Sequence, residues 1–120
     1  MEAVGSSMEP TVPGGSFLSI EPLCGAPAID ELIVFVQDRG ELLCCHRVIA
    51  RDERGYLTQG DRHKAPDGFA RPEQIVGVVR RFALGGRDYR VGPGLPRPRP
   101  SAYRMQRQRL VRLMRRLNVL

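Results

Sequence analysis

Four side chains in this sequence carry the functional groups of an acyl-transfer site. Ser7 stands in the segment Ser6-Ser7-Met8-Glu9-Pro10-Thr11, His46 follows two adjacent cysteines, and Asp61 and Asp67 lie in a polar stretch further along the chain. A serine hydroxyl is a weak nucleophile at neutral pH and needs a base within hydrogen-bond reach. A histidine, with an ordinary pKa of about 6.5, supplies such a base, and a carboxylate holds the imidazole in the required tautomer. The residue types therefore point to acyl transfer at Ser7, provided that the fold brings them together.

The segment around Ser7 has the composition of a turn, which suits a nucleophile. Met8 is apolar and can anchor the turn in the core, while Pro10 restricts the direction in which the chain leaves it. The backbone N–H of Ser7 can donate to the oxyanion that forms when a carbonyl is attacked. Taken alone, the same pattern also fits an ordinary solvated turn.

Five short segments rich in β-branched, aromatic or alternating apolar residues are predicted to be strands. They span residues 17–21, 31–36, 42–50, 56–59 and 74–82. Strands at short, regular spacing without a helical period between them indicate a small antiparallel, mainly β domain. In this arrangement Ser7 precedes the first strand, His46 lies on the third, and both aspartates lie in a long polar loop, residues 60–72.

The C-terminal part of the chain differs in composition and charge. Residues 85–100 are dense in proline and glycine, which predicts a linker after a domain formed by residues 1–84. Residues 101–120 place leucines on one helical stripe among arginines, which predicts a basic amphipathic helix. Residues 97–120 carry a net charge of +8, whereas the whole chain carries +6, so the net charge of the remaining residues is −2. Two roles stay open for the helix, packing on protein or contact with anionic membrane; no nucleic acid is expected, because no aromatic platform accompanies the arginines.

Three sequence boxes, in this order, resemble the type I signal peptidases and their SOS-repressor-like relatives. The first is Ser7-Met8-Glu9-Pro10-Thr11, in which the family's nucleophile is the serine before the methionine. The second is His46-Arg47-Val48-Ile49, and the third is Thr58-Gln59-Gly60-Asp61, continuing to Asp67. The resemblance covers residues 5–80 and implies the family's fold and its serine endopeptidase activity.

The residue at the base position separates two versions of this family. Bacterial-type members use a lysine there, whereas the archaeal and endoplasmic-reticulum type has a histidine, which matches His46. Lys64, the only lysine, follows the third box and is a minor alternative base; it and His63 are predicted to be surface residues. Family spacing favours Asp67 as the third member, with Asp61 as structural support or co-contributor, and both stay candidates.

The resemblance also implies a substrate and leaves alternatives. Relatives cleave leader or signal peptides after small side chains (signal peptide processing), so a peptide or protein precursor is the expected partner. Gly5 stands where many bacterial members place a serine that assists the oxyanion, so the Ser7 N–H is the expected donor. Self-cleavage is not expected, because relatives that cut themselves do so in an arm before the serine. A soluble maturation protease for a specific peptide or metalloprotein precursor, and a non-catalytic binding module of the same fold, are the alternatives.

Composition limits the other functions that are compatible with the chain. No run of about 18 apolar residues is present, so no transmembrane helix is expected. No secretory signal opens the chain, and we expect a cytoplasmic or peripheral membrane protein. Cys24, Cys44 and Cys45 form neither a disulfide framework nor a Cys-x-x-Cys motif, and no His-x-x-x-His spacing occurs. No structural metal and no cofactor are therefore expected.

Overall fold

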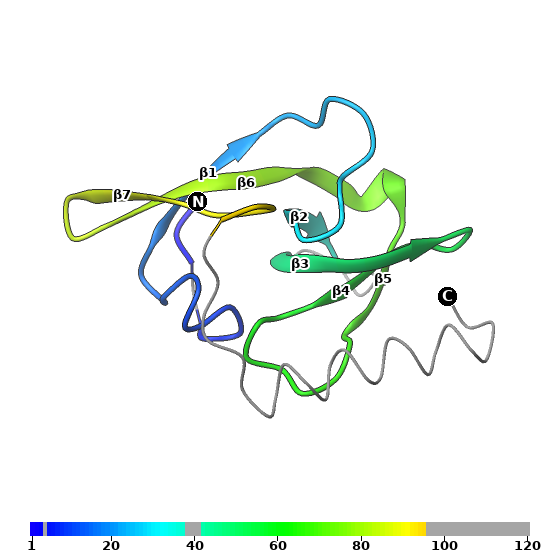
Figure 1. Ribbon diagram of the computed structural model, residues 1–120, viewed down its shortest axis with the longest axis horizontal. Coiled ribbons are helices and arrows are strands. Elements are labelled where there is room, and N and C mark those ends of the chain that lie inside the picture. Colours follow the sequence, from blue (N-terminus) through cyan, green and yellow to red (C-terminus); the bar gives the residue numbers. More distant parts are fainter. Residues whose placement is uncertain (4, 38–41, 96–120) are drawn as a thin grey trace.

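Seven antiparallel strands form one sheet in the computed structural model, which describes residues 1–3, 5–37 and 42–95. The strands are β1 (Phe17–Glu21), β2 (Leu32–Val36), β3 (Leu43–Asp52), β4 (Gly55–Gln59), β5 (Gly68–Ala70), β6 (Ile75–Leu84) and β7 (Arg87–Arg90), and a short 3-10 helix, η1 (Pro72–Gln74), precedes β6. Their order across the sheet is β1-β6-β2-β3-β4-β5, and β7 pairs with β6 (Figure 1). The predicted antiparallel, mainly β class is confirmed.

Strand β2 is buried on both of its faces, which explains its continuous apolar sequence. Leu32 and Val34 belong to one cluster of buried side chains, and Ile33 and Phe35 belong to a second. The first cluster also contains Met8 from the opening segment. The core therefore extends from the sheet to the residue that follows Ser7.

The register between β2 and β3 decides which way the polar residues of β3 point. His46 pairs with Ile33, and Arg47 pairs with Leu32. Since successive side chains on a strand point to opposite faces, His46 and Arg47 lie on different sides of the sheet. Both residues are buried, His46 at 6% exposure and Arg47 at 3%. Each must therefore find its polar partners within the protein.

The loop that carries both aspartates is shorter than the sequence predicts. Residues 60–72 were expected to lack regular structure, but they include the edge strand β5, which pairs with β4. Backbone hydrogen bonds close the remaining loop, from His63 N–H to the Gly60 carbonyl at 2.9 Å and from Asp67 N–H to the Thr58 carbonyl at 2.8 Å. A strand of three residues has too few positions for an alternating pattern to be recognised.

Strand β7 lies within residues 85–100, which the composition predicts to be a linker. That prediction is wrong for residues 87–90, which pair with β6. Gly85 and Gly86 connect the two strands with φ angles of 58° and 77°, as a two-residue hairpin turn requires. Residues 96–120 lie outside the described part of the chain, so the amphipathic helix at 101–120 and its contact with an anionic membrane stay predictions.

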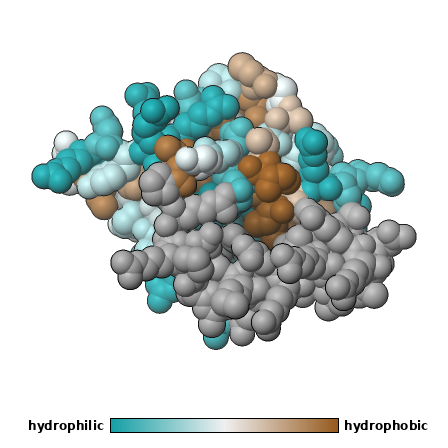
Figure 2. Space-filling view, viewed as in Figure 1, coloured by the Kyte–Doolittle hydropathy of each residue, from teal (hydrophilic) through white to brown (hydrophobic). Residues whose placement is uncertain are grey.

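The surface of the described residues combines polar borders with an apolar patch. Figure 2 shows brown, apolar side chains in the middle of one face, next to hydrophilic side chains in teal. Leu42, which directly precedes β3, and Leu43, its first residue, are among the exposed large apolar residues, at 72% and 45% exposure. In the part of the chain that the structure describes, no helix has the length and apolar character needed to cross a bilayer.

Candidate functional site

The backbone around Ser7 is fixed by contacts with the loop between β4 and β5. The Ser7 carbonyl accepts a hydrogen bond from the Arg62 N–H at 2.9 Å, and the Asp61 N–H lies 3.4 Å from the sulfur of Met8. A Cβ atom added to Gly60 would lie 2.7 Å from the Ser7 carbonyl oxygen, so only glycine permits this approach. The opening segment and the loop therefore hold each other in place, although more than fifty residues separate them.

His46 joins this serine to a carboxylate. Its Nε2 lies 3.2 Å from the Ser7 hydroxyl oxygen, and its Nδ1 lies 3.1 Å from one carboxylate oxygen of Asp67. With Asp67 accepting from Nδ1–H, the unprotonated Nε2 faces the serine. Three segments that are distant in the sequence thus meet in the geometry that a general base and its nucleophile require.

The two predicted aspartates occupy different environments. The Asp67 carboxylate accepts a hydrogen bond from the Gly60 N–H at 2.7 Å in addition to its contact with His46. Asp61 instead accepts two hydrogen bonds from the Arg47 guanidinium, each at 2.8 Å, and one from the Thr11 hydroxyl. The structure therefore brings Asp67 to the histidine and uses Asp61 to connect the opening segment to β3.

Removal of the Asp61 carboxylate is expected to destabilise the fold. Asp61→Ala leaves the Arg47 guanidinium buried without its ion-pair partner, and breaking a buried pair in this way costs about 3–5 kcal/mol. The free energy of unfolding, measured by urea denaturation, should fall by this amount. The double replacement Arg47→Met with Asp61→Leu should recover most of the loss, because it removes both charges. A loss below about 1 kcal/mol for Asp61→Ala, typical of a surface ion pair, would contradict the structural role.

Burial lowers the pKa of His46. Desolvation is the main cause of the lowered pKa. The Asp67 carboxylate opposes the shift, His63 adds to it, and Asp61 opposes it with the smallest effect. The imidazole is therefore neutral at pH 7, which is the state in which Nε2 accepts a proton.

The lowered pKa predicts how stability depends on pH. Above the ordinary histidine pKa of about 6.5, His46 is neutral in both the folded and the unfolded chain. As the pH falls below that value, the unfolded chain takes up the proton first, so the free energy of unfolding decreases until the pH passes below the pKa of the folded state. Urea denaturation between pH 8 and pH 5, with a chelator present, should show a larger decrease for the wild type than for His46→Gln. Equal pH dependence in the two proteins would contradict the shift.

His63 is the residue of this site that the sequence reasoning missed. Its side chain is 39% exposed, in agreement with the predicted surface position, and its Nδ1 lies 2.7 Å from the second carboxylate oxygen of Asp67. The rings of His46 and His63 meet edge to face, with their centroids 5.4 Å apart. His63 and Asp67 are four residues apart, but within a loop this spacing does not predict that two side chains meet. The contact is therefore visible only in the folded chain. Lys64 is exposed, as predicted.

Cys44 is a second potential nucleophile near His46. Its sulfur lies 3.5 Å from both ring nitrogens. Burial raises the pKa of the Cys44 thiol, while Gln37 lowers it and Asp67 raises it further. A cysteine attacks as the thiolate, so a raised pKa keeps it unreactive. Ser7 is therefore the better candidate.

The backbone N–H of Ser7 can serve in a further role. Among residues 1–3, 5–37 and 42–95, no acceptor pairs with it. Gly5, two residues earlier, is exposed and adopts a φ of 89°. An unpaired backbone donor next to the serine hydroxyl is the element that an oxyanion site needs.

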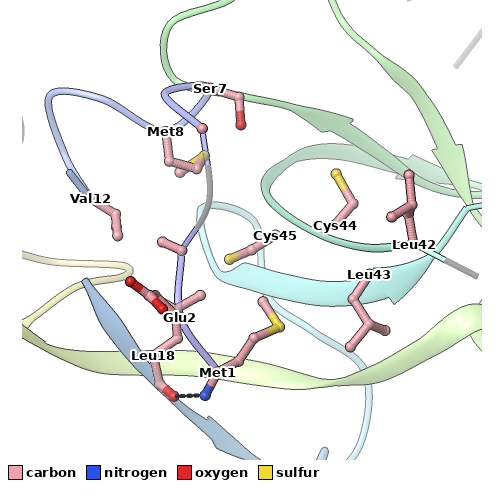
Figure 3. A pocket seen from close by; sticks show the side chains of 12 residues that line it. Met1, Glu2, Ser7, Met8, Val12, Leu18, Leu42, Leu43, Cys44 and Cys45 are labelled. Atoms are coloured by element: carbon pink, nitrogen blue, oxygen red, sulfur yellow. Dashed lines mark hydrogen bonds between the residues drawn. The ribbon is translucent and has the colours of Figure 1, made fainter. Parts of the chain in front are cut away.

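An apolar cavity of about 360 Å³ opens beside Ser7 (Figure 3). Ser7 lies at one end of the group of lining side chains, and Met1 and Leu18 lie at the other. Most of the lining is apolar. The apolar side chains include those of Met1, Met8, Val12, Leu18, Leu42 and Leu43. Such a cavity suits apolar side chains of a peptide whose carbonyl is presented to Ser7.

Comparisons with known proteins identify no relative. No family model matches the chain, and neither a curated protein nor a solved structure matches it significantly. Membership of the signal-peptidase family therefore stays a prediction from the three sequence boxes.

Proposed function

We propose that this protein is a serine endopeptidase of the signal-peptidase type, which cleaves leader or signal peptides after small residues. One observation carries the proposal: His46 lies between Ser7 and Asp67, with Nε2 at 3.2 Å from the hydroxyl oxygen and Nδ1 at 3.1 Å from the carboxylate. The three sequence boxes that resemble the family supply these same residues. The apolar cavity beside Ser7 supports a peptide substrate rather than a charged small molecule.

The proposed reaction proceeds through an acyl-enzyme. The Ser7 hydroxyl oxygen attacks the scissile carbonyl carbon while His46 Nε2 takes its proton. The carbonyl oxygen becomes an oxyanion that accepts a hydrogen bond from the Ser7 N–H. His46 then donates its proton to the leaving amine, and the peptide bond breaks.

Hydrolysis of the acyl-enzyme completes the cycle. His46 Nε2 removes a proton from water, whose oxygen attacks the ester carbonyl. The ester bond then breaks as His46 Nε2 gives this proton to the Ser7 oxygen, which restores the hydroxyl and releases the carboxylic acid product. Asp67 keeps the Nδ1 proton in place and stabilises the imidazolium in both steps. The Gly60 N–H, at 2.7 Å from the Asp67 carboxylate, holds that group in position.

A peptide-cleavage assay tests this proposal. The full-length protein is incubated with a set of leader peptides that differ only in the residue before the cut, and mass spectrometry identifies the products. We expect cleavage after alanine or glycine and little cleavage after bulky residues. Cleavage of none of the peptides, together with tight binding of some of them, would favour the non-catalytic binding module instead.

A further inference from the structure

His46, the general base of the proposed mechanism, belongs to a compact cluster of two histidines and one carboxylate. His46, His63 and Asp67 each offer a ligand atom, and these atoms all lie within 4.8 Å of one another. The side chains of Asp67 and His63 are 28% and 39% exposed, so an ion can reach them from solvent, whereas that of His46 is 7% exposed. The cluster therefore has one buried and two accessible members.

We propose that these three side chains bind a divalent transition-metal ion, of which zinc fits best. Imidazole nitrogens and a carboxylate oxygen are ordinary zinc ligands, and water supplies the fourth position of an open site. Ligand atoms at 2.0–2.1 Å from a tetrahedral ion lie roughly 3.3–3.4 Å apart. One carboxylate oxygen of Asp67 lies 3.1 Å from His46 Nδ1 and the other lies 2.7 Å from His63 Nδ1, which is close to that separation.

Neighbouring groups already hold two of the ligands. The Gly60 N–H donates to the Asp67 carboxylate at 2.7 Å. The side-chain amide of Gln59, which is fully buried, donates to the His63 carbonyl at 2.6 Å. The first contact orients a ligand group directly, as outer contacts at metal sites do. The second fixes the backbone that carries the His63 ring.

Metal binding has a direct consequence for the peptidase site, which rests on the proposed function. An ion bound to His46 Nδ1 displaces the proton from that nitrogen, so the neutral ring carries its proton on Nε2. Nε2 then faces Ser7 as a donor and accepts no proton from it. Asp67 is occupied by the ion at the same time. Zinc therefore switches off the base, and peptide hydrolysis stops until the ion is removed.

Calorimetric titration of zinc into the Ser7→Ala full-length protein tests the site without any peptidase activity. After removal of metals with a chelator, we expect one ion per chain. His63→Ala in the same background should weaken binding by at least about tenfold, whereas the neighbouring Lys64→Ala should leave it unchanged. No binding, or binding that His63→Ala does not weaken, overturns the proposal.

Two further measurements test the site: the zinc affinity of a Cys44 variant, and the effect of zinc on peptide hydrolysis. Cys44→Ser should not change the affinity; a loss there with none in His63→Ala would assign the ion to Cys44 and overturn the site. In wild-type protein that cleaves a peptide, zinc should inhibit and chelator should restore the rate, and His63→Ala should need at least about tenfold more zinc. Zinc binding without inhibition of an active enzyme overturns the switch. If no peptide is cleaved, the proposed function fails, while the titration still decides the metal site.

Discussion

Ser7→Ala is expected to lower the rate of peptide hydrolysis by a factor on the order of 10⁶, as loss of the nucleophile does in serine proteases. In the proposed mechanism the hydroxyl oxygen forms the acyl-enzyme, and it lies 3.2 Å from His46 Nε2. Alanine offers no nucleophile at this position. The rate is measured with a peptide that the wild type cleaves. Intact-mass spectrometry of the wild type should also detect the acyl adduct, which the variant should not form.

Ser6 provides a matched control for this replacement. It precedes Ser7 directly and is exposed, so Ser6→Ala changes the same type of side chain in the same turn. We expect Ser6→Ala to keep most of the activity. If Ser7→Ala still hydrolysed the peptide, Ser7 would not be the nucleophile. If Cys44→Ser then abolished the remaining hydrolysis, the nucleophile would be the cysteine beside His46.

His46→Ala should have an effect of similar size, on the order of 10⁶, because the nucleophile and its base act as a unit. Without the imidazole, the proposed mechanism has no group that takes the proton from Ser7. Activity should be compared at several pH values, since the wild-type rate should fall as the pH drops through the lowered pKa of His46. Circular dichroism confirms that the variant is folded, because the replaced side chain is buried.

Lys64→Ala is the control that separates histidine from lysine as the base of the proposed mechanism. Lys64 is exposed and follows the third sequence box, so its removal should leave hydrolysis unchanged. A variant series in which His46→Ala retains turnover and Lys64→Ala abolishes it would make lysine the base. Loss of activity in both variants would require a mechanism with two proton-transfer groups.

The sequence by itself determined the class of the fold and the residue types of the site. Local patterns carry this information: β-branched and apolar runs mark strands such as β2, and the position of His46 on a strand follows from the alternation around it. The three boxes, through their resemblance to the family, indicate Ser7, His46 and two aspartates as candidate site residues. Composition was less reliable for β7, because a Gly-Gly pair is compatible both with a linker and with a tight hairpin turn.

Only the tertiary structure decided which of these groups contact one another. The choice between Asp61 and Asp67 depends on how one loop closes against both β3 and the opening segment, and these contacts join residues that are far apart in the chain. Strand alternation sends Arg47 to the opposite face from His46, so the buried guanidinium attracts Asp61 and leaves Asp67 for the imidazole. The contact of His63 with Asp67 arises in the same loop, where no periodic pattern fixes the direction of a side chain.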